Sequence, residues 1–426
     1  MPLKHVVETP ITDGPHETPE FIDDGIPFVS AEAVSSGEIN FSKSRFISHA
    51  DHHKYSKKYK PRRDDIFMVK SGATTGVVAL VSTDRDFNIW SPLAVVRCSR
   101  LAFPRYILQT MRSRNFQESV ILNWSFGTQQ NIGMSVIENL RIPLPPISEQ
   151  NQIARFLDHE TARIDALIEE QQRLIELLKE KRQAVISHAV TKGLDPTVPM
   201  KDSGAEWLGE VPAHWETLRI GAVYSEAADK GLAELPVLRV SIHHGVSDKE
   251  LSEEESDRKI TRIDDREKYK RVRPGDLVYN MMRAWQGGFG AVLVNGLVSP
   301  AYVVARPKNE DISRYVEQLL RTGCAVEEMR KNSYGITDFR LRLYWDQFKN
   351  IVIVIPPEVE RLQIMERIDS LINESEALKS EADRLIVILQ ERRSALISAA
   401  VTGKIDVRGW QPPARAQAPV LEAEAV

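Results

Sequence analysis

Two segments of the chain concentrate positive charge at corresponding places. Residues 42–70 carry nine Lys or Arg against three Asp, and residues 256–273 carry eight against four acidic residues. Each segment leads into an apolar run that starts at an aspartate, Asp65 or Asp276. Clustered cations suit contacts to nucleic-acid phosphates, which position a protein without reading bases. A solubilising surface would explain one such cluster equally well, but the recurrence favours DNA binding. The predicted phosphate contacts are Lys43, Lys54, Lys57, Lys58, Lys60, Arg62, Arg63 and Lys70 in the first segment, and Arg258, Lys259, Arg262, Lys268, Lys270, Arg271 and Arg273 in the second.

Side chains that can read base edges follow each basic segment. Base reading requires forked or amide groups on exposed loops. Trp285 lies among the candidates of the second half, but core packing explains it at least as well. The candidates are Ser71, Thr74, Thr75, Asn123, Ser125, Thr128, Gln129, Gln130 and Asn131 in the first half, and Arg283, Gln286, Asn332, Ser333 and Tyr334 in the second.

No stretch predicts catalysis by this chain alone. The sequence lacks a Gly-x-x-x-x-Gly-Lys-Ser/Thr phosphate loop and the Asn/Asp-Pro-Pro-Phe/Tyr motif of amino-methyltransferases. The best metal candidate, His49 with His52 and His53, has no Cys or acidic cluster at ligand spacing. In a Lys- and Ser-rich loop such histidines are more often solvated or phosphate-facing. We therefore predict no catalytic residue, no metal and no cofactor in this chain.

The bulk composition is that of an ordinary soluble protein. The hydrophobic share of 42%, the charged share of 27% and the net charge of −4 exclude a polycation. Cys98 and Cys324 stand far apart without a CxxC pair, which suits a reducing compartment. We find no signal peptide and no apolar run of about 18 residues, so we predict a cytoplasmic location and no membrane partner.

A repeated stretch must position these candidates. Residues 145–191 and 356–402 align without a gap at an offset of 211, with 21 of 47 positions identical. Steps of four and three place aliphatic residues on a narrow stripe of each copy, which indicates a coiled-coil seam rather than an ordinary amphipathic helix. The predicted seam residues are Ile153, Leu157, Ile164, Leu167, Leu174, Leu178 and Val185 in the first copy, and Ile364, Ile368, Leu371, Leu378, Leu385, Leu389 and Leu396 in the second.

Two globular segments lie before and between these helices. Turn residues between short apolar runs predict an α+β domain, with strands at 77–81 and 93–96 and a helix at 103–123. A weaker sequence similarity repeats this plan in 199–351. Because the ends of a compact domain usually lie close together, helices that share a seam must run antiparallel. The predicted fold is α+β, with related domains at 1–144 and 199–355, antiparallel coiled-coil helices at 145–192 and 356–403, an approximate twofold axis, and a disordered tail at 408–426.

The chain resembles the DNA-specificity subunit of type I restriction–modification systems. The stretches that carry the resemblance are ITDGPH (11–16) with GIPF (25–28), WLGEVPAHW (207–215), MRAWQG (282–287) with SPAY (299–302), and PPISEQ (145–150). The resemblance implies a non-catalytic subunit with two target-recognition domains, each of which reads one half of an asymmetric, split site in double-stranded DNA. It also implies that the helices set the spacing and dock two methyltransferase subunits, which hold S-adenosylmethionine. Translocase–nuclease subunits, which use ATP and Mg²⁺, would join for cleavage.

Two alternatives remain open on the sequence. The chain could be the specificity part of a solitary or fused restriction–methylation enzyme, although no methyltransferase or nuclease motif is present. It could also be a coiled-coil scaffold whose end domains bind proteins. Neighbouring genes for a methyltransferase and a helicase–nuclease would favour the specificity-subunit interpretation over both alternatives.

Overall fold

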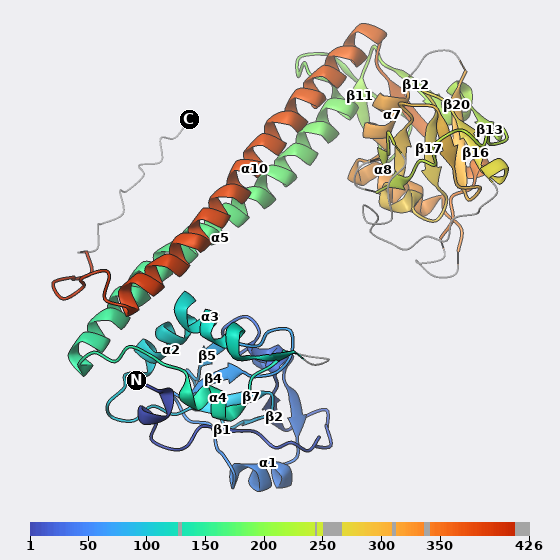
Figure 1. Ribbon diagram of the computed structural model, residues 1–426. Coiled ribbons are helices and arrows are strands. Elements are labelled where there is room, and N and C mark those ends of the chain that lie inside the picture. Colours follow the sequence, from blue (N-terminus) through green and yellow to red (C-terminus); the bar gives the residue numbers. More distant parts are fainter. Residues whose placement is uncertain (127–129, 243–244, 250–265, 309–311, 336–340, 414–426) are drawn as a thin grey trace. The chain divides into compact units, whose positions relative to one another are not determined.

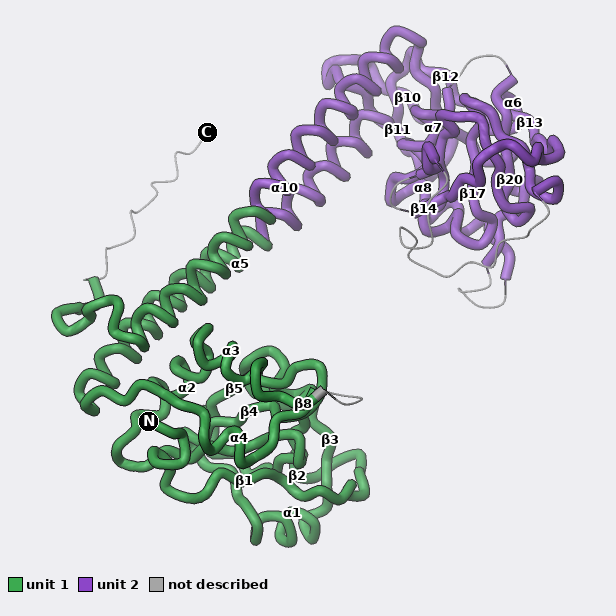
Figure 2. Tube along the Cα trace, viewed as in Figure 1, with its two compact units in different colours: residues 1–172, 383–426 green, residues 173–382 purple. Residues whose placement is uncertain are grey.

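The computed structural model describes residues 1–126, 130–242, 245–249, 266–308, 312–335 and 341–413 (Figure 1). The chain divides into two compact units (Figure 2). Unit 1 consists of Met1–Gln172 and Asp383–Val426, and unit 2 consists of Arg173–Ala382. Each unit has its own apolar core. Among the described helices, none combines the length and the apolar character that crossing a membrane requires.

A four-stranded antiparallel sheet forms the centre of unit 1. Its strand order is β1 (Thr12–Asp13), β7 (Leu93–Val96), β4 (Ile66–Val69) and β5 (Val78–Leu80). Every residue of β4 and β7 is buried, which explains why these strands are continuous runs of apolar residues. The two strands predicted from the sequence are therefore present, the first of them shorter than expected.

Unit 2 repeats this sheet. Its strand order is β13 (Tyr224–Ala227), β20 (Tyr302–Pro307), β17 (Leu277–Asn280) and β18 (Phe289–Ala291), with the same antiparallel pairings. β17 and β18 begin 211 residues after β4 and β5. The offset of the helical repeat therefore extends into the globular parts.

The remaining elements surround these sheets. In unit 1 they are η1 (Leu3–His5), β2 (Ile26–Val29), η2 (Ala31–Val34), η3 (Phe41–Lys43), β3 (Arg45–Ile47), α1 (His49–Ser56), β6 (Asn88–Ile89), α2 (Pro104–Arg112), α3 (Arg114–Asn123), β8 (Ser125–Phe126), β9 (Gln130–Asn131) and α4 (Met134–Asn139). In unit 2 they are β10 (Met200–Asp202), β11 (Glu210–Pro212), β12 (Glu216–Arg219), α6 (Ile220–Val223), β14 (Val240–Ser241), β15 (Gly245–Val246), η4 (Arg266–Lys268), β16 (Lys270–Val272), η5 (Ala284–Gln286), β19 (Gly296–Val298), α7 (Ser313–Leu320), α8 (Gly323–Lys331), α9 (Trp345–Phe348) and β21 (Val352–Ile355).

The single helix predicted for 103–123 is wrong, because α2 and α3 are separate helices. Ser113 has extended backbone angles, φ −63° and ψ 147°, and its hydroxyl accepts a hydrogen bond from the Phe116 amide at 3.4 Å. The same hydroxyl donates to the carbonyl of Thr110 at 2.6 Å. Ser113 thus ends one helix and caps the next, a role in which a short hydroxyl side chain competes well with the helical backbone.

Two long helices, α5 (Ile147–Lys192) and α10 (Glu358–Val401), confirm the predicted helical repeat. Within each unit their parts run antiparallel. In unit 1 Arg393 of α10 donates to Asp165 of α5 at 2.8 Å, and in unit 2 Arg182 of α5 donates to Glu376 of α10 at 2.7 Å. The offset of 211 relates Asp165 to Glu376 and Arg182 to Arg393, so the two units contain the same ion pair with the helices exchanged.

Four of the fourteen predicted seam residues are wrong, because their side chains are exposed. Ile164, Leu178, Val185 and their counterparts Leu389 and Leu396 are buried or half-buried, as predicted. Ile153, Leu157, Ile364, Ile368 and Leu371 are buried or half-buried as well. At three of the four exposed positions the following residue is half-buried instead, namely Ile168, Ile175 and Ile386. The outward-facing positions, with 39–55% of their surface exposed, are Leu167, Leu174, Leu378 and Leu385. The cause is a run of apolar doublets, because Leu167-Ile168 and Leu174-Ile175 offer an aliphatic side chain on either stripe.

Each domain core continues into the long helices. Ile153, Leu157 and Ile397 belong to the core of unit 1, and the counterparts Ile364 and Ile368 belong to that of unit 2. A buried tyrosine adds a polar tie in each unit. The Tyr106 hydroxyl donates to the carbonyl of Val401 at 3.4 Å, and the Tyr315 hydroxyl donates to that of Val190 at 2.8 Å. Both acceptors lie in the last turn of a long helix, where main-chain carbonyls lack helical partners.

The first residues of the tail that was predicted to be disordered, 408–413, are described and lie next to α5. The Trp410 ring packs edge-on against Phe156, with ring centroids 5.4 Å apart, and the Gln152 amide donates to the carbonyls of Val407 and Trp410. The sequence prediction weighed prolines and alanines and overlooked this single aromatic anchor. Residues 414–426 lie outside the described part of the chain.

Candidate nucleic-acid interface

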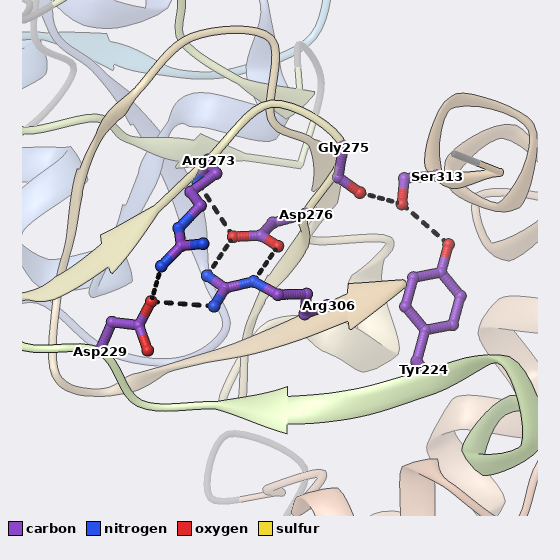
Figure 3. Close-up of polar contacts among 7 residues, drawn as sticks. All are labelled: Tyr224, Asp229, Arg273, Gly275, Asp276, Arg306 and Ser313. Atoms are coloured by element: carbon purple, nitrogen blue, oxygen red, sulfur yellow. Dashed lines mark hydrogen bonds and ion pairs between the residues drawn. The ribbon is translucent and has the colours of Figure 1, made fainter. Parts of the chain in front are cut away.

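A buried carboxylate holds the end of the basic segment in unit 2 (Figure 3). The main-chain amide of Arg273 donates to Asp276 at 2.9 Å. The Arg306 guanidinium donates hydrogen bonds to both oxygens of the same carboxylate, at 2.9 and 3.0 Å. Arg273 and Arg306 also donate to Asp229, at 2.8 and 2.9 Å. Because Asp276 directly precedes β17, this network fixes the basic segment to the central sheet.

Unit 1 contains an equivalent anchor, in which the amide donor and the aspartate lie 211 residues before those of unit 2 and the arginine lies 209 residues before. The amide of Arg62 donates to Asp65 at 2.8 Å, and the Arg97 guanidinium binds both oxygens, each at 2.7 Å. The Tyr59 hydroxyl donates to the same carboxylate at 2.5 Å. Burial, followed by the charge of Asp65, raises the pKa of Tyr59 well above its usual value, so the hydroxyl stays a donor. Sequence reasoning missed Arg97 and Arg306, whose only signal is an arginine at the end of a buried apolar strand.

Five of the eight cations predicted for unit 1 form ion pairs within the protein. Lys58 and Lys70 both contact Asp13, at 2.6 and 2.9 Å. Burial opposes ionisation of Asp13, but hydrogen bonds from Lys58 and Lys70 hold its pKa below the usual value. The other pairs are Lys54–Glu17, Lys60–Asp86 and Arg63–Asp84. Among the described residues, no carboxylate forms an ion pair with Lys43, Lys57 or Arg62.

The histidines of this segment lie on a helix, so the predicted loop is wrong. The Ser48 hydroxyl caps α1 by accepting from the Asp51 amide at 3.1 Å. His52 uses Nδ1 in a contact of 2.6 Å with the side-chain oxygen of Asn88, which is buried. Within the described part of the chain, no group of three His, Cys, Asp or Glu side chains has the arrangement of a metal site.

The predicted cations of unit 2 are only partly described. Arg258, Lys259 and Arg262 lie outside the described residues. Lys270 donates to the carbonyl of Tyr302 at 2.7 Å, Arg271 is half-buried, and Lys268 is exposed on η4. The guanidinium of Arg273 serves the anchor described above. Phosphate binding by this segment therefore stays a prediction.

The structure brings several predicted base-reading residues of unit 1 together. The loop after β4 lies against β9, where Ser71 pairs with Asn131 and the Gly72 amide donates to the Gln130 carbonyl at 3.0 Å. The Thr75 hydroxyl closes the loop by donating to the Gly72 carbonyl at 2.7 Å. Asn123 and Ser125 donate to nearby main-chain carbonyls, and Thr74 is half-buried in the loop after β4. Thr128 and Gln129 lie outside the described residues.

In unit 2 an equivalent main-chain pairing lies next to a different set of predicted base-reading residues. The Leu343 amide donates to the Met281 carbonyl at 3.0 Å, at positions 211 residues after the Ile132–Lys70 hydrogen bond of 2.8 Å. Arg283 donates to Gln286 at 2.8 Å, which pre-orients both side chains. Asn332 and Ser333 bond back to α8, Tyr334 is exposed, and half-buried Trp285 donates to the carbonyl of Met282.

Comparisons with known proteins agree with this arrangement. Residues 9–178 match the family model of the type I restriction modification DNA specificity domain. The EcoKI specificity subunit of Escherichia coli K12 is 22% identical over 419 residues, which span 91% of this chain and 84% of the relative. The MjaVIII specificity subunit of Methanocaldococcus jannaschii is 26% identical over 316 residues, 70% of this chain and 69% of the relative.

A solved structure shares the fold. It comes from work on complex assembly and conformational transition of the type I restriction–modification system, and it superposes with a TM-score of 0.65 at 16% identity over 95% of this chain and 97% of its own. At 16% identity, the structural similarity shows the fold alone. The sequence similarity comes from the family model and from the specificity subunits, whose alignments cover most of this chain. The chain is therefore similar over most of its length to the DNA-specificity subunits of type I restriction–modification systems, and its residues 9–178 match the model of their DNA specificity domain.

Proposed function

We propose that each unit reads one half of a bipartite DNA site. The observation that carries the proposal is the repetition of one arrangement in both units. A buried aspartate, Asp65 or Asp276, anchors a basic segment, and the next loop pairs with a later segment of the unit through the Lys70 or Met281 carbonyl. The basic segment supplies phosphate contacts, and the paired loops supply side chains to base edges.

The two half-sites should differ, because the shared scaffold presents different side chains. At the loop after the central strand, unit 1 offers Ser71 and Thr75 and unit 2 offers Arg283 and Gln286. An arginine fork reads guanine, and an amide reads adenine, more selectively than a hydroxyl does. Identical domains would favour a palindrome, so this divergence supports an asymmetric site.

We further propose that methyltransferase subunits dock on the long helices. Three outward aliphatic positions recur in both helices at the offset of 211, with 39–55% of their surface exposed: Leu167, Leu174 and Leu177, and Leu378, Leu385 and Ile388. Exposed apolar rows on a soluble helix are costly unless a partner covers them. Two copies of the row support two methyltransferase subunits, which would supply S-adenosylmethionine and the chemistry. Translocase–nuclease subunits with ATP and Mg²⁺ complete the proposed complex, in which this chain is the non-catalytic part.

Replacing Leu174 and Leu385 together by lysine should abolish binding of the methyltransferase subunit without changing the unfolding midpoint of this chain. The reason is that these side chains lie outside the helix contact, so lysine disturbs only a partner surface. Size-exclusion chromatography of the mixed subunits measures the complex, and transfer of labelled methyl groups to DNA measures its function. Glu180→Lys with Glu391→Lys is the matched control, because these exposed residues also share the offset. Complex formation by the double leucine variant at wild-type affinity would exclude the apolar row as the docking surface.

Replacing Lys57 and Arg62 by alanine should weaken binding to specific and non-specific DNA alike. The slope of log Kd against log salt should fall by up to about 0.9 for each phosphate that the protein no longer neutralises, or about 1.8 for the pair. The control is Lys60→Ala with Arg63→Ala, which removes the same charge from side chains already paired with Asp86 and Asp84. Fluorescence anisotropy across a salt series measures both slopes. A larger decrease of slope in the control pair would contradict the assignment of the free cations.

A further inference from the structure

Unit 1 holds an arginine without an acidic partner in a polar pocket. Arg112 ends α2, is half-buried, and donates to the Gly37 carbonyl at 2.7 Å. Among the described residues, no carboxylate forms an ion pair with its guanidinium. The pocket beside it measures about 440 Å³, and its polar wall comes from Ser36, Gln117, Gln390, Arg393 and Ser394.

The equivalent arginine of unit 2 does have an acidic partner. Arg321 follows α7 as Arg112 ends α2, and the next residue, Thr322 or Ser113, caps the following helix in both units. Arg321 donates to a loop carbonyl at 2.7 Å, as Arg112 does, and also to the carboxylate of Glu317 at 2.8 Å. Glu317 lies four residues before Arg321, and the residue four before Arg112 is Leu108. The internal anion of unit 2 is therefore replaced by an apolar side chain in unit 1.

The local electrostatics leave room for an anion. Burial, followed by the charge of Arg393, lowers the pKa of Arg112, and the charges of Glu38, Asp165 and Asp158 oppose this decrease without reversing it. Arg393 is itself paired with Asp165 at 2.8 Å, whereas among the described residues no carboxylate lies within ion-pair distance of the Arg112 guanidinium. A half-buried cation without a direct ion-pair partner carries a desolvation cost that a bound anion would offset. In unit 2 the buried carboxylate of Glu317 already fills that role.

We propose that this pocket of unit 1 binds a phosphate group. The guanidinium of Arg112 offers a fork that matches phosphate oxygens. Ser36, Ser394 and Gln390 line the same pocket, so two hydroxyls and an amide can add neutral donors, and such a mixed set suits the several oxygens of a phosphate. The pocket is also larger than one carboxylate needs. Its walls belong to the domain and to α10 of the same unit, so bound phosphate would add a contact between them.

The phosphate could come from a small molecule or from the DNA backbone. Gly76, in the pocket wall, directly follows the loop that contains Ser71 and Thr75. The pocket therefore lies close to the proposed reading loop in the chain. The site itself does not depend on DNA reading, since the argument rests on Arg112 and its counterpart in unit 2. Its test can fail while the proposed function stands.

Isothermal titration of the full chain with inorganic phosphate, at constant ionic strength against chloride, tests the proposal. We expect one phosphate bound per chain and a rise in the unfolding midpoint. Arg112→Met should weaken phosphate binding about tenfold or more, the size expected for one charge-assisted contact. Arg100→Met is the control, because Arg100 is an exposed arginine of the same domain. Equal phosphate affinity in wild type and Arg112→Met would overturn the proposal.

A second variant keeps Arg112 and gives it an internal carboxylate. Leu108→Glu should place that carboxylate where Glu317 stands in unit 2, and a folded Leu108→Glu protein should lose phosphate binding. The reciprocal variant Glu317→Leu should create a second phosphate site at Arg321. Unchanged phosphate affinity in folded Leu108→Glu would also overturn the proposal.

Two further measurements identify the source of the phosphate, and each outcome supports the site. If DNA supplies it, Arg112→Met weakens DNA binding and added phosphate competes with DNA. If a small molecule supplies it, DNA affinity in phosphate-free buffer is the same for wild type and Arg112→Met.

Discussion

Replacing Asp65 by alanine is expected to lower the free energy of unfolding of unit 1 by about 3–5 kcal/mol, the cost of leaving one partner of a buried ion pair uncompensated. The Asp65 carboxylate is 1% exposed and accepts from Arg97, Tyr59 and the Arg62 amide. Without it Arg97 keeps a hydrogen bond of 2.9 Å to the Lys60 carbonyl and its place over the Tyr59 ring, but it loses its carboxylate partner. Guanidinium chloride unfolding, followed by tryptophan fluorescence, measures the change.

The equivalent change in unit 2, Asp276→Ala, should cost less. Arg306 retains a second carboxylate, that of Asp229 at 2.9 Å, so its charge stays compensated. Asp84→Ala is the exposed control, because its pair with Arg63 is open to solvent on both sides and contributes little. If Asp65→Ala were no more destabilising than Asp84→Ala, the anchor would not be what holds the basic segment. Weaker DNA binding without a change in preferred sequence should accompany the decrease in stability.

The existence and length of the long helices follow from the sequence, but the phase of their contact does not. A seven-residue apolar repeat over 47 positions, seen twice, admits few folds other than a long helix pair. Doublets such as Leu167-Ile168 and Leu174-Ile175 satisfy two neighbouring stripes equally. The choice between them depends on the partner helix, where Ala382, for example, is buried in the contact. The residues left outside form the row that we assign to a partner.

The sequence predicts where the basic segments of the candidate interface lie, but it does not predict which of their cations form ion pairs. The sequence shows that cations cluster before Asp65 and Asp276, because charge is a local property. It does not show that Asp84 and Asp86, some twenty residues later, fold back onto Arg63 and Lys60. Asp13 lies still farther away in the chain and forms ion pairs with both Lys58 and Lys70. Only tertiary structure separates cations that neutralise a neighbour from cations that remain for phosphates.

Exchanging residues 1–140 for the equivalent domain of a relative with a different half-site should change one half of the recognised sequence and leave the other intact. The physical reason is that each unit carries its own anchor, basic segment and reading loop. A mismatched base pair typically costs about 1–3 kcal/mol, so about three altered positions would suffice to abolish methylation at the old site. Methylome sequencing of cells that carry the variant reads the new site directly. A change in both half-sites would show that the units do not read independently.

Lengthening both helices should alter the gap between the half-sites and neither half-site itself. One heptad inserted after Arg173 and one after Arg384 keep the contact stripe in phase, because that stripe repeats every seven residues. The insertion leaves Asp165–Arg393 on one side and Arg182–Glu376 on the other, so both ion pairs survive. Seven residues add about 10.5 Å of helix, close to three base pairs at about 3.4 Å each. A four-residue insertion is the out-of-phase control and should lower stability, because it rotates the stripe away from its partner. If the gap follows the identity of the exchanged domain and stays constant when the helices grow, the helices do not set the spacing and the bipartite proposal fails at that step.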